Sequence, residues 1–162
     1  MRTDLNAIAE AIKREAHRVE EDCMYSSKGH YNAAASWSHT HLWIGIPTAI
    51  LAAIASGTAF GDHGVIAGCL GIGVTALSAL STFLDPSGKS NAHRSAANQY
   101  LSLRNLTRIF RELELGSGDN ETLKKRIKEL AAHRDSLNES SLSWTAPFSL
   151  LSPDHNWGFV ES

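Results

Sequence analysis

The chain has 162 residues, of which 43% are hydrophobic and 20% charged, and its formal net charge is −2. This length fits one domain-sized unit. The small net charge argues against a surface that binds nucleic acid directly. With only two cysteines, the simplest inference is a reducing compartment. The N-terminal residues are strongly charged, so we expect no cleavable signal peptide.

Residues 4–28 have the pattern of an amphipathic helix. Apolar side chains recur there at steps of three and four, and charged residues occupy the rest of the circumference. The apolar series consists of Leu5, Ile8, Ile12, Ala16, Val19 and Cys23. We expect this helix to pack on other helices or, alternatively, to lie on a lipid surface. Residues 29–41 lead from it into an apolar stretch and complete an N-terminal region over 4–41.

Residues 42–84 contain two runs without a charged side chain, 42–60 and 65–84, joined by GDHG. At ~1.5 Å per residue, each run spans roughly 28–30 Å as a helix, which is the thickness of a bilayer's hydrocarbon core. As core helices of a soluble protein, these runs would need a protein shell on every side. The rest of the chain is too small to supply that shell. The sequence therefore predicts an all-α protein with a two-helix transmembrane hairpin over 42–84.

The basic residues predict the orientation of this hairpin. All 15 Lys and Arg residues lie outside it, five before and ten after. Positive charge marks the cytoplasmic side of a membrane. We therefore expect a protein of the cell membrane with both termini in the cytoplasm.

Small residues recur every four positions on both sides of the GDHG turn. This row comprises Ala49, Ala53, Gly57, Gly61, Gly64 and Gly68. Small residues four apart let helix backbones approach closely in lipid, where packing drives helix association. The row predicts close contact within one hairpin or between hairpins.

A second stripe of small and polar residues follows the second run, and it consists of Gly71, Thr75, Ser78 and Thr82. One interpretation is that these hydroxyls bond back to their own helix, or that the stripe packs against another helix. A sharper hypothesis is that several copies turn their stripes inward and line a water-filled pore. Because two helices leave no lumen, that hypothesis requires a homo-oligomer.

Residues 85–141 are predicted to form C-terminal helices outside the membrane, over 90–115 and 121–141, after Asp85-Pro86 ends the second run. The apolar side of the first consists of Ala96, Tyr100, Leu103, Ile109, Phe110 and Leu113. The second carries Leu123, Ile127, Leu130 and Leu137 beside a basic cluster at 124–128. We interpret that cluster as a solvated face, with lipid headgroups or a nucleotide phosphate as alternative contacts. The tail, 142–162, has prolines and aromatic residues, and we expect it to pack on the helices or on a neighbouring subunit.

This layout resembles the SLATT domain, over nearly the whole chain. The helix after the hairpin carries the matching residues His93, Ala97, Tyr100, Leu103, Arg104 and Arg108. Before the hairpin, Tyr25, Lys28, His30, Tyr31, Ala34 and Trp37 are also similar to that family, as is Ala146-Pro147 near the end. SLATT domains are two-transmembrane effector domains found with nucleotide-synthesising and nucleotide-sensing proteins in bacterial defence systems.

The resemblance implies a membrane effector of the bacterial inner membrane that oligomerises and forms a pore when an infection is sensed. It implies a separate trigger, which is a cyclic oligonucleotide or a sensor encoded nearby, such as a nucleotidyltransferase or reverse transcriptase. Arg104 and Arg108 lie four apart, and we expect them to pair with Glu20, Glu21 or Asp22, or alternatively to accept an anionic trigger. We expect neither catalytic residues, nor metal ligands, nor a cofactor. The alternatives are a non-conducting membrane scaffold and a small toxin that needs no trigger.

Overall fold

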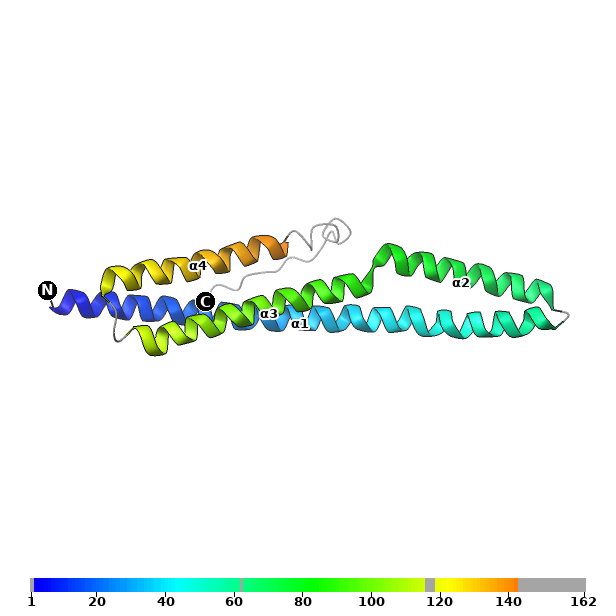
Figure 1. The fold of residues 1–162 in the computed structure, drawn as a ribbon, viewed down its shortest axis with the longest axis horizontal. Coiled ribbons are helices and arrows are strands. Elements are labelled where there is room, and N and C mark those ends of the chain that lie inside the picture. Colours follow the sequence, from blue (N-terminus) through cyan, green and yellow to red (C-terminus); the bar gives the residue numbers. More distant parts are fainter. Residues whose placement is uncertain (1, 62, 116–118, 143–162) are drawn as a thin grey trace, which may run out of the picture. The chain divides into compact units, whose positions relative to one another are not determined.

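The computed structural model describes residues 2–61, 63–115 and 119–142, and within them every element of regular structure is a helix (Figure 1). The elements are α1 (Arg2–Phe60), α2 (Gly64–Leu84), α3 (Pro86–Ile109), the π-helical η1 (Phe110–Glu114) and α4 (Asn120–Leu142). No strand occurs in these ranges, which confirms the all-α part of the predicted fold class. The predicted tail lies outside the described residues, apart from its first residue.

The first helix, α1, is longer than the sequence pattern indicates. The predicted helix over 4–28, the lead-in over 29–41 and the first apolar run form one unbroken helix of 59 residues. The lead-in is rich in alanine, which has the highest helix propensity, and it contains no proline. Pro47 lies inside α1 without ending it.

The residues divide into two compact units. The first unit takes the chain up to Tyr25 and from Gln99 onward, and the second unit comprises Ser26–Asn98. Both boundaries fall inside helices, since α1 and α3 each contribute to both units.

The first unit has a core of apolar side chains from α1, α3, η1 and α4. Its buried members are Ile12, Ala16, Val19 and Cys23 from α1, Tyr100, Leu103 and Phe110 from α3 and η1, and Leu123, Ile127, Leu130 and Leu137 from α4. The apolar series predicted for 4–28 and for 121–141 therefore forms the core, as far as these side chains are described.

The prediction was partly wrong for 90–115. Ile109 and Leu113 are 45% and 71% exposed, whereas Thr107 is fully buried. The buried positions follow the line of Leu103, Thr107 and Phe110, and Thr107 fits there because its hydroxyl donates to the Leu103 carbonyl at 2.9 Å. Burying a threonine costs little free energy when its hydroxyl is hydrogen-bonded to a carbonyl of its own helix.

In the second unit, α2 and α3 meet at Asp85, as predicted. Asp85 ends α2 in the left-handed region, with φ of 40°. Its Oδ1 atom accepts a hydrogen bond from the Gly88 backbone N–H at 3.0 Å, and Pro86 is the first residue of α3. Asp85 is thus both the C-cap of α2 and the N-cap of α3, and proline suits the first helical position.

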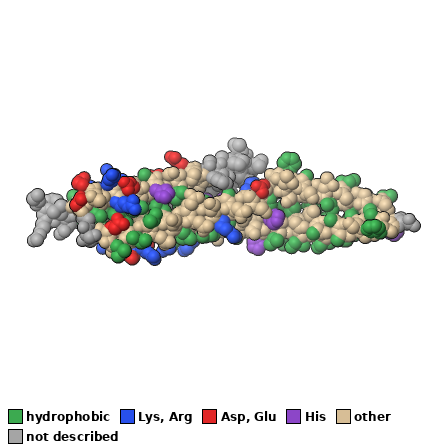
Figure 2. Space-filling view, in the orientation of Figure 1, with side chains coloured by type: hydrophobic (Ala, Val, Ile, Leu, Met, Phe, Trp, Pro, Cys, Tyr) green, Lys and Arg blue, Asp and Glu red, His purple; other side chains and the backbone are tan. Residues whose placement is uncertain are grey.

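The apolar helices of the second unit leave their side chains uncovered. Two helices are long and apolar enough to cross a membrane, and none of the residues in their most apolar windows is buried. The large exposed side chains there are Leu42, Trp43, Ile46, Ile50, Ile54, Phe60, Val65, Ile66, Ile72, Leu80 and Phe83. Figure 1 shows α2 running back along the last part of α1, and Figure 2 shows no acidic or basic side chain over these segments on the visible face.

Candidate functional site

The candidate site is a polar contact between α1 and α3 in the second unit, just before and just after the uncharged helices. We call it the polar junction. It comprises His30, Tyr31, Ala34 and Trp37 of α1 with Lys89, Ser90, His93 and Asn98 of α3. Its partners are 52 to 67 positions apart in the sequence, so the contacts depend on α3 lying against α1.

Hydrogen bonds and one cation–π contact fix the alignment of these two helices. The buried Ser90 hydroxyl donates to the Ala34 carbonyl at 2.8 Å, and the Tyr31 hydroxyl donates to Asn98 Oδ1 at 2.6 Å. Lys89 Nζ lies 4.3 Å from the centre of a Trp37 ring, close enough for a cation–π attraction. The junction is therefore a specific contact, because hydrogen bonds depend on the direction of their donors and acceptors and so fix how α3 lies against α1.

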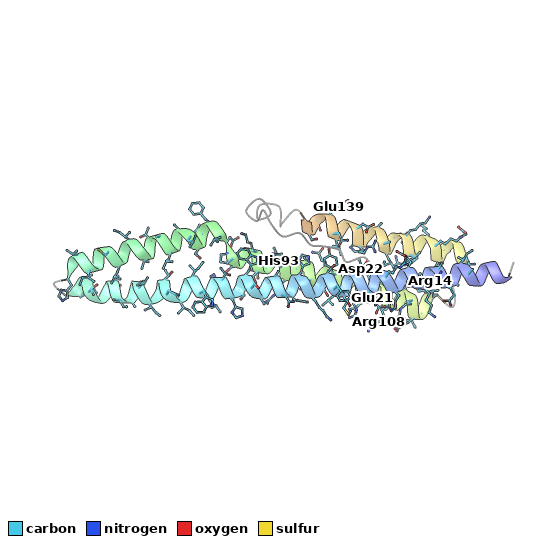
Figure 3. All side chains as sticks on the ribbon, turned by 180° about the vertical axis from the view of Figure 1, so that it is seen from behind. Arg14, Glu21, Asp22, His93, Arg108 and Glu139 are labelled. Atoms are coloured by element: carbon cyan, nitrogen blue, oxygen red, sulfur yellow. The ribbon has the colours of Figure 1, made fainter. Side chains whose placement is uncertain are left out.

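His30 and His93 form the titratable centre of the polar junction. Figure 3 labels His93 on α3. The Nδ1 atoms of the two histidines are 2.9 Å apart, and the ring centroids are 5.2 Å apart. Such a bond needs one Nδ1–H donor and one Nδ1 lone pair, so at least one ring is neutral, and when both rings are neutral they hold opposite tautomers. Burial lowers the pKa of both histidines, and for His30 the neighbouring His93 lowers the pKa further.

We predict that acidification loosens the polar junction. Because each folded-state pKa lies below the ordinary value of 6.5, the separated helices bind protons more readily than the packed ones. The neutral histidines stabilise the packed junction relative to the separated helices. This stabilisation is fully present above pH 6.5 and is lost as the pH falls through the folded-state pKa. Hydrogen exchange of residues 30–34 and 90–94 should therefore quicken between pH 7.5 and pH 5, after correction for the intrinsic rate.

The matched control is the double variant His30→Gln with His93→Gln, which keeps hydrogen-bonding side chains but removes the titration. Its protection at these residues should change less with pH than that of the wild type. An equal pH dependence in both proteins would show that other groups cause the loosening.

The structure places the predicted pore stripe on an accessible side of α2. Thr75, Ser78 and Thr82 are exposed, and Gly71 is half-buried. The Thr75 hydroxyl donates to the Gly71 carbonyl at 2.9 Å, and the Thr82 hydroxyl donates to the Ser78 carbonyl at 3.0 Å. These two hydroxyls bond back to their own helix, and their oxygens keep lone pairs that can accept further hydrogen bonds.

The row of small residues does not form a close contact within the chain. Ala49, Ala53, Gly57, Gly61, Gly64 and Gly68 are all exposed. A Cβ atom added at Gly57, Gly64 or Gly68 would meet no other side chain or helix within 4 Å. Contact between copies of the chain stays a prediction for this row.

The residues of the SLATT resemblance fall into both units. In the second unit, His93 belongs to the polar junction and Ala97 is fully buried. In the first, Leu103 is in the core, and the buried Tyr100 donates its hydroxyl to Asn138 Oδ1 at 2.8 Å. Arg108 is exposed and forms no ion pair within the described part of the chain.

Ion pairs in the first unit differ in part from those we expected. Arg104 reaches Glu20 at 4.0 Å, as predicted, but Glu20 lies closer to Arg111, with 3.1 Å between Oε2 and Nε. Asp22 pairs with Arg134 at 2.9 Å. Sequence reasoning missed Arg111 and Arg134, because a charge on a polar helix face has many potential partners until the helices are placed.

Little in the described residues resembles a catalytic centre. Burial raises the pKa of the Cys23 thiol to about 11, so this cysteine is not a thiolate at neutral pH. No group of three potential metal ligands occurs among the residues that the structure covers. The described residues instead comprise an apolar core in the first unit and, within the second unit, a hydrogen-bonded junction and two apolar helix segments with exposed side chains. Comparisons with protein-family models, curated proteins and solved structures find no match for this chain.

Proposed function

We propose that this protein is a membrane effector that inserts the last part of α1 and all of α2 as a transmembrane hairpin, with both termini in the cytoplasm of a bacterium. The observation that carries the proposal is the combination of two long uncharged helix segments with side chains that none of the described residues covers. Leaving these side chains in water would be costly, at about 25 cal/mol per Å² of apolar surface. Lipid removes that cost.

We further propose that several copies assemble and open a pore. A single pair of helices leaves no lumen, but the exposed Thr75, Ser78 and Thr82 are free to face the same stripe on neighbouring copies. The exposed row of small residues offers the close contact between helices that holds such an assembly together in lipid. The resemblance to the SLATT domain supports this function.

Activation is proposed to be a shift between two states. The helical core of the first unit holds the hairpins in a closed arrangement, and a trigger binds the open arrangement more tightly. In line with the resemblance, the trigger is a cyclic oligonucleotide or a sensor protein encoded nearby. Without a trigger, a minor open state populated at roughly 0.1–10% gives a slow basal leak.

The test is ion flux through lipid vesicles that contain the purified chain. We expect the protein to resist alkaline extraction from the vesicles and to release potassium faster than protein-free vesicles do. Protein that is removed by alkaline extraction would contradict membrane insertion. Protein that stays inserted but gives no flux would contradict the pore.

A non-conducting scaffold is the second candidate function. Leu106, Ile109 and Leu113 form an exposed apolar stripe along α3 and η1 in the first unit, at 43%, 45% and 71% exposure. Exposed apolar stripes of this kind mark surfaces for other proteins. The scaffold predicts insertion without flux, and loss of partner recruitment when Leu106 and Leu113 are replaced by serine.

A further inference from the structure

A small polar pocket lies in the second unit, at the level where the uncharged helices end. Its volume is about 150 Å³, which is the space of roughly five water molecules at ~30 Å³ each. The lining residues come from α1 and α3 only, and they are Ser38, His41, Ser87, Ser90, Asn91 and Arg94. No carboxylate is among them.

The lining offers hydrogen-bond donors to a negatively charged group. The guanidinium of Arg94 carries five N–H donors, and it forms no ion pair with any acid in the part of the chain that the structure describes. The side chains of Ser38, Ser87, His41 and Asn91 add further donors. The Ser90 hydroxyl donates to the Ala34 carbonyl, so it can only accept.

The balance of charge around the pocket is positive. Between residues 26 and 98 the cations are Lys28, Lys89 and Arg94, and two of the three lie on α3 within the stretch that lines the pocket. The acid nearest in sequence, Asp85, uses its carboxylate to cap α3 through Gly88. An arginine matches the oxygens of a phosphate with two parallel N–H bonds.

The position of the pocket points to the source of the phosphate. His41 directly precedes the first uncharged run, and Ser87 follows Leu84, the last residue of α2, by three positions. If the proposed insertion is correct, on which this step rests, both residues lie at the level of the lipid headgroups. Trp37 and Trp43 lie on α1 on either side of His41, and tryptophan favours the same level.

We propose that this pocket binds the phosphodiester of an anionic lipid headgroup, with Arg94 as its principal ligand. Binding there ties α1 and α3 together at the membrane surface, beside the polar junction. The anionic lipids of the membrane thereby stabilise the packed arrangement of the two helices.

The test is a lipid titration of the full-length protein in detergent, read by native mass spectrometry. The probes are phosphatidylglycerol, a neutral glycolipid with the same acyl chains, and inorganic phosphate. The wild type should bind phosphatidylglycerol more tightly than the glycolipid, and Arg94→Gln should weaken phosphatidylglycerol binding about tenfold, which is the usual loss for one charge-assisted contact. Arg94→Lys should retain an intermediate affinity.

Arg18→Gln is the matched control, because it removes one exposed arginine of α1 outside the pocket. It should leave the affinity for phosphatidylglycerol within about twofold. Equal losses in both variants would overturn the proposal in favour of general charge attraction. Arg94-dependent binding of inorganic phosphate without binding of phosphatidylglycerol would contradict the proposal that the bound phosphate belongs to a lipid headgroup. Because binding is measured in detergent, the result does not depend on whether the chain conducts.

Discussion

Replacing Thr75 and Ser78 together with leucine is expected to reduce potassium flux through vesicles to the level of protein-free vesicles, while the protein remains inserted. Both residues are exposed on α2 and one turn apart. In the proposed assembly, each of them therefore lies at the same depth as its counterpart in the neighbouring copies. Leucine adds bulk and removes two groups that can bond to water. Narrow hydrophobic constrictions gate by dewetting, and we expect a loss of conductance of at least about 100-fold.

The hydroxyl of Thr75 does not need to leave its helix for this effect. It donates to the Gly71 carbonyl at 2.9 Å, and its oxygen accepts a hydrogen bond from pore water at the same time. Leucine is also among the residues that favour membrane insertion most. A loss of flux therefore cannot be assigned to failed insertion, which alkaline extraction checks directly.

The control adds the same bulk at the same depth. Ala76 and Ala79 are exposed on α2 one position further along, and they lie about 100° around the helix from Thr75 and Ser78. The double variant Ala76→Leu with Ala79→Leu should conduct within about threefold of the wild type. Unchanged flux in the Thr75 and Ser78 variant would remove the proposed pore face.

The sequence predicts the elements of this protein better than their contacts. The spacing of apolar residues predicts the core faces of α1 and α4, and the length of the two runs without charged residues predicts the two apolar helix segments. Both signals are local in the sequence. The continuity of α1 through residues 29–41 was harder to predict, since the change from an amphipathic to an apolar pattern looks like a boundary. The π turn at Phe110–Glu114 has no comparable local signal, and it moved Leu113 away from the core.

The polar junction shows why the site was only partly predictable. His30 and His93 were each noted in the resemblance, but nothing in the sequence indicates that their Nδ1 atoms lie 2.9 Å apart. Such a pair depends on the rotation of α3 about its own axis, which is fixed by distant contacts such as Ser90 with Ala34. For the row of small residues, the sequence does predict a close helix contact, but it does not say which helices are in contact. The same spacing suits contact within one chain and contact between chains.

Replacing Phe110 with alanine is expected to unfold the first unit while the second unit keeps its structure. Phe110 is 1% exposed and packs in the core that α1, α3 and α4 share. Truncating a buried phenylalanine costs about 3–5 kcal/mol, and a unit of this size has a stability of only a few kcal/mol. Hydrogen exchange of α4 should therefore lose most of its protection, while the backbone around Ser90 keeps its own.

Leu113→Ala is the matched control, since it truncates another large apolar side chain of the same π turn. Leu113 is 71% exposed, so the free energy of unfolding should fall by less than about 0.5 kcal/mol. The contrast tests whether η1 turns Phe110 inward and Leu113 outward, because an α-helical continuation would rotate the residues after Phe110 by a different angle. Equal losses of α4 protection in the two variants would contradict this arrangement, and unchanged protection in Phe110→Ala would show that α4 is held by the Arg134–Asp22 and Tyr100–Asn138 contacts without the apolar core.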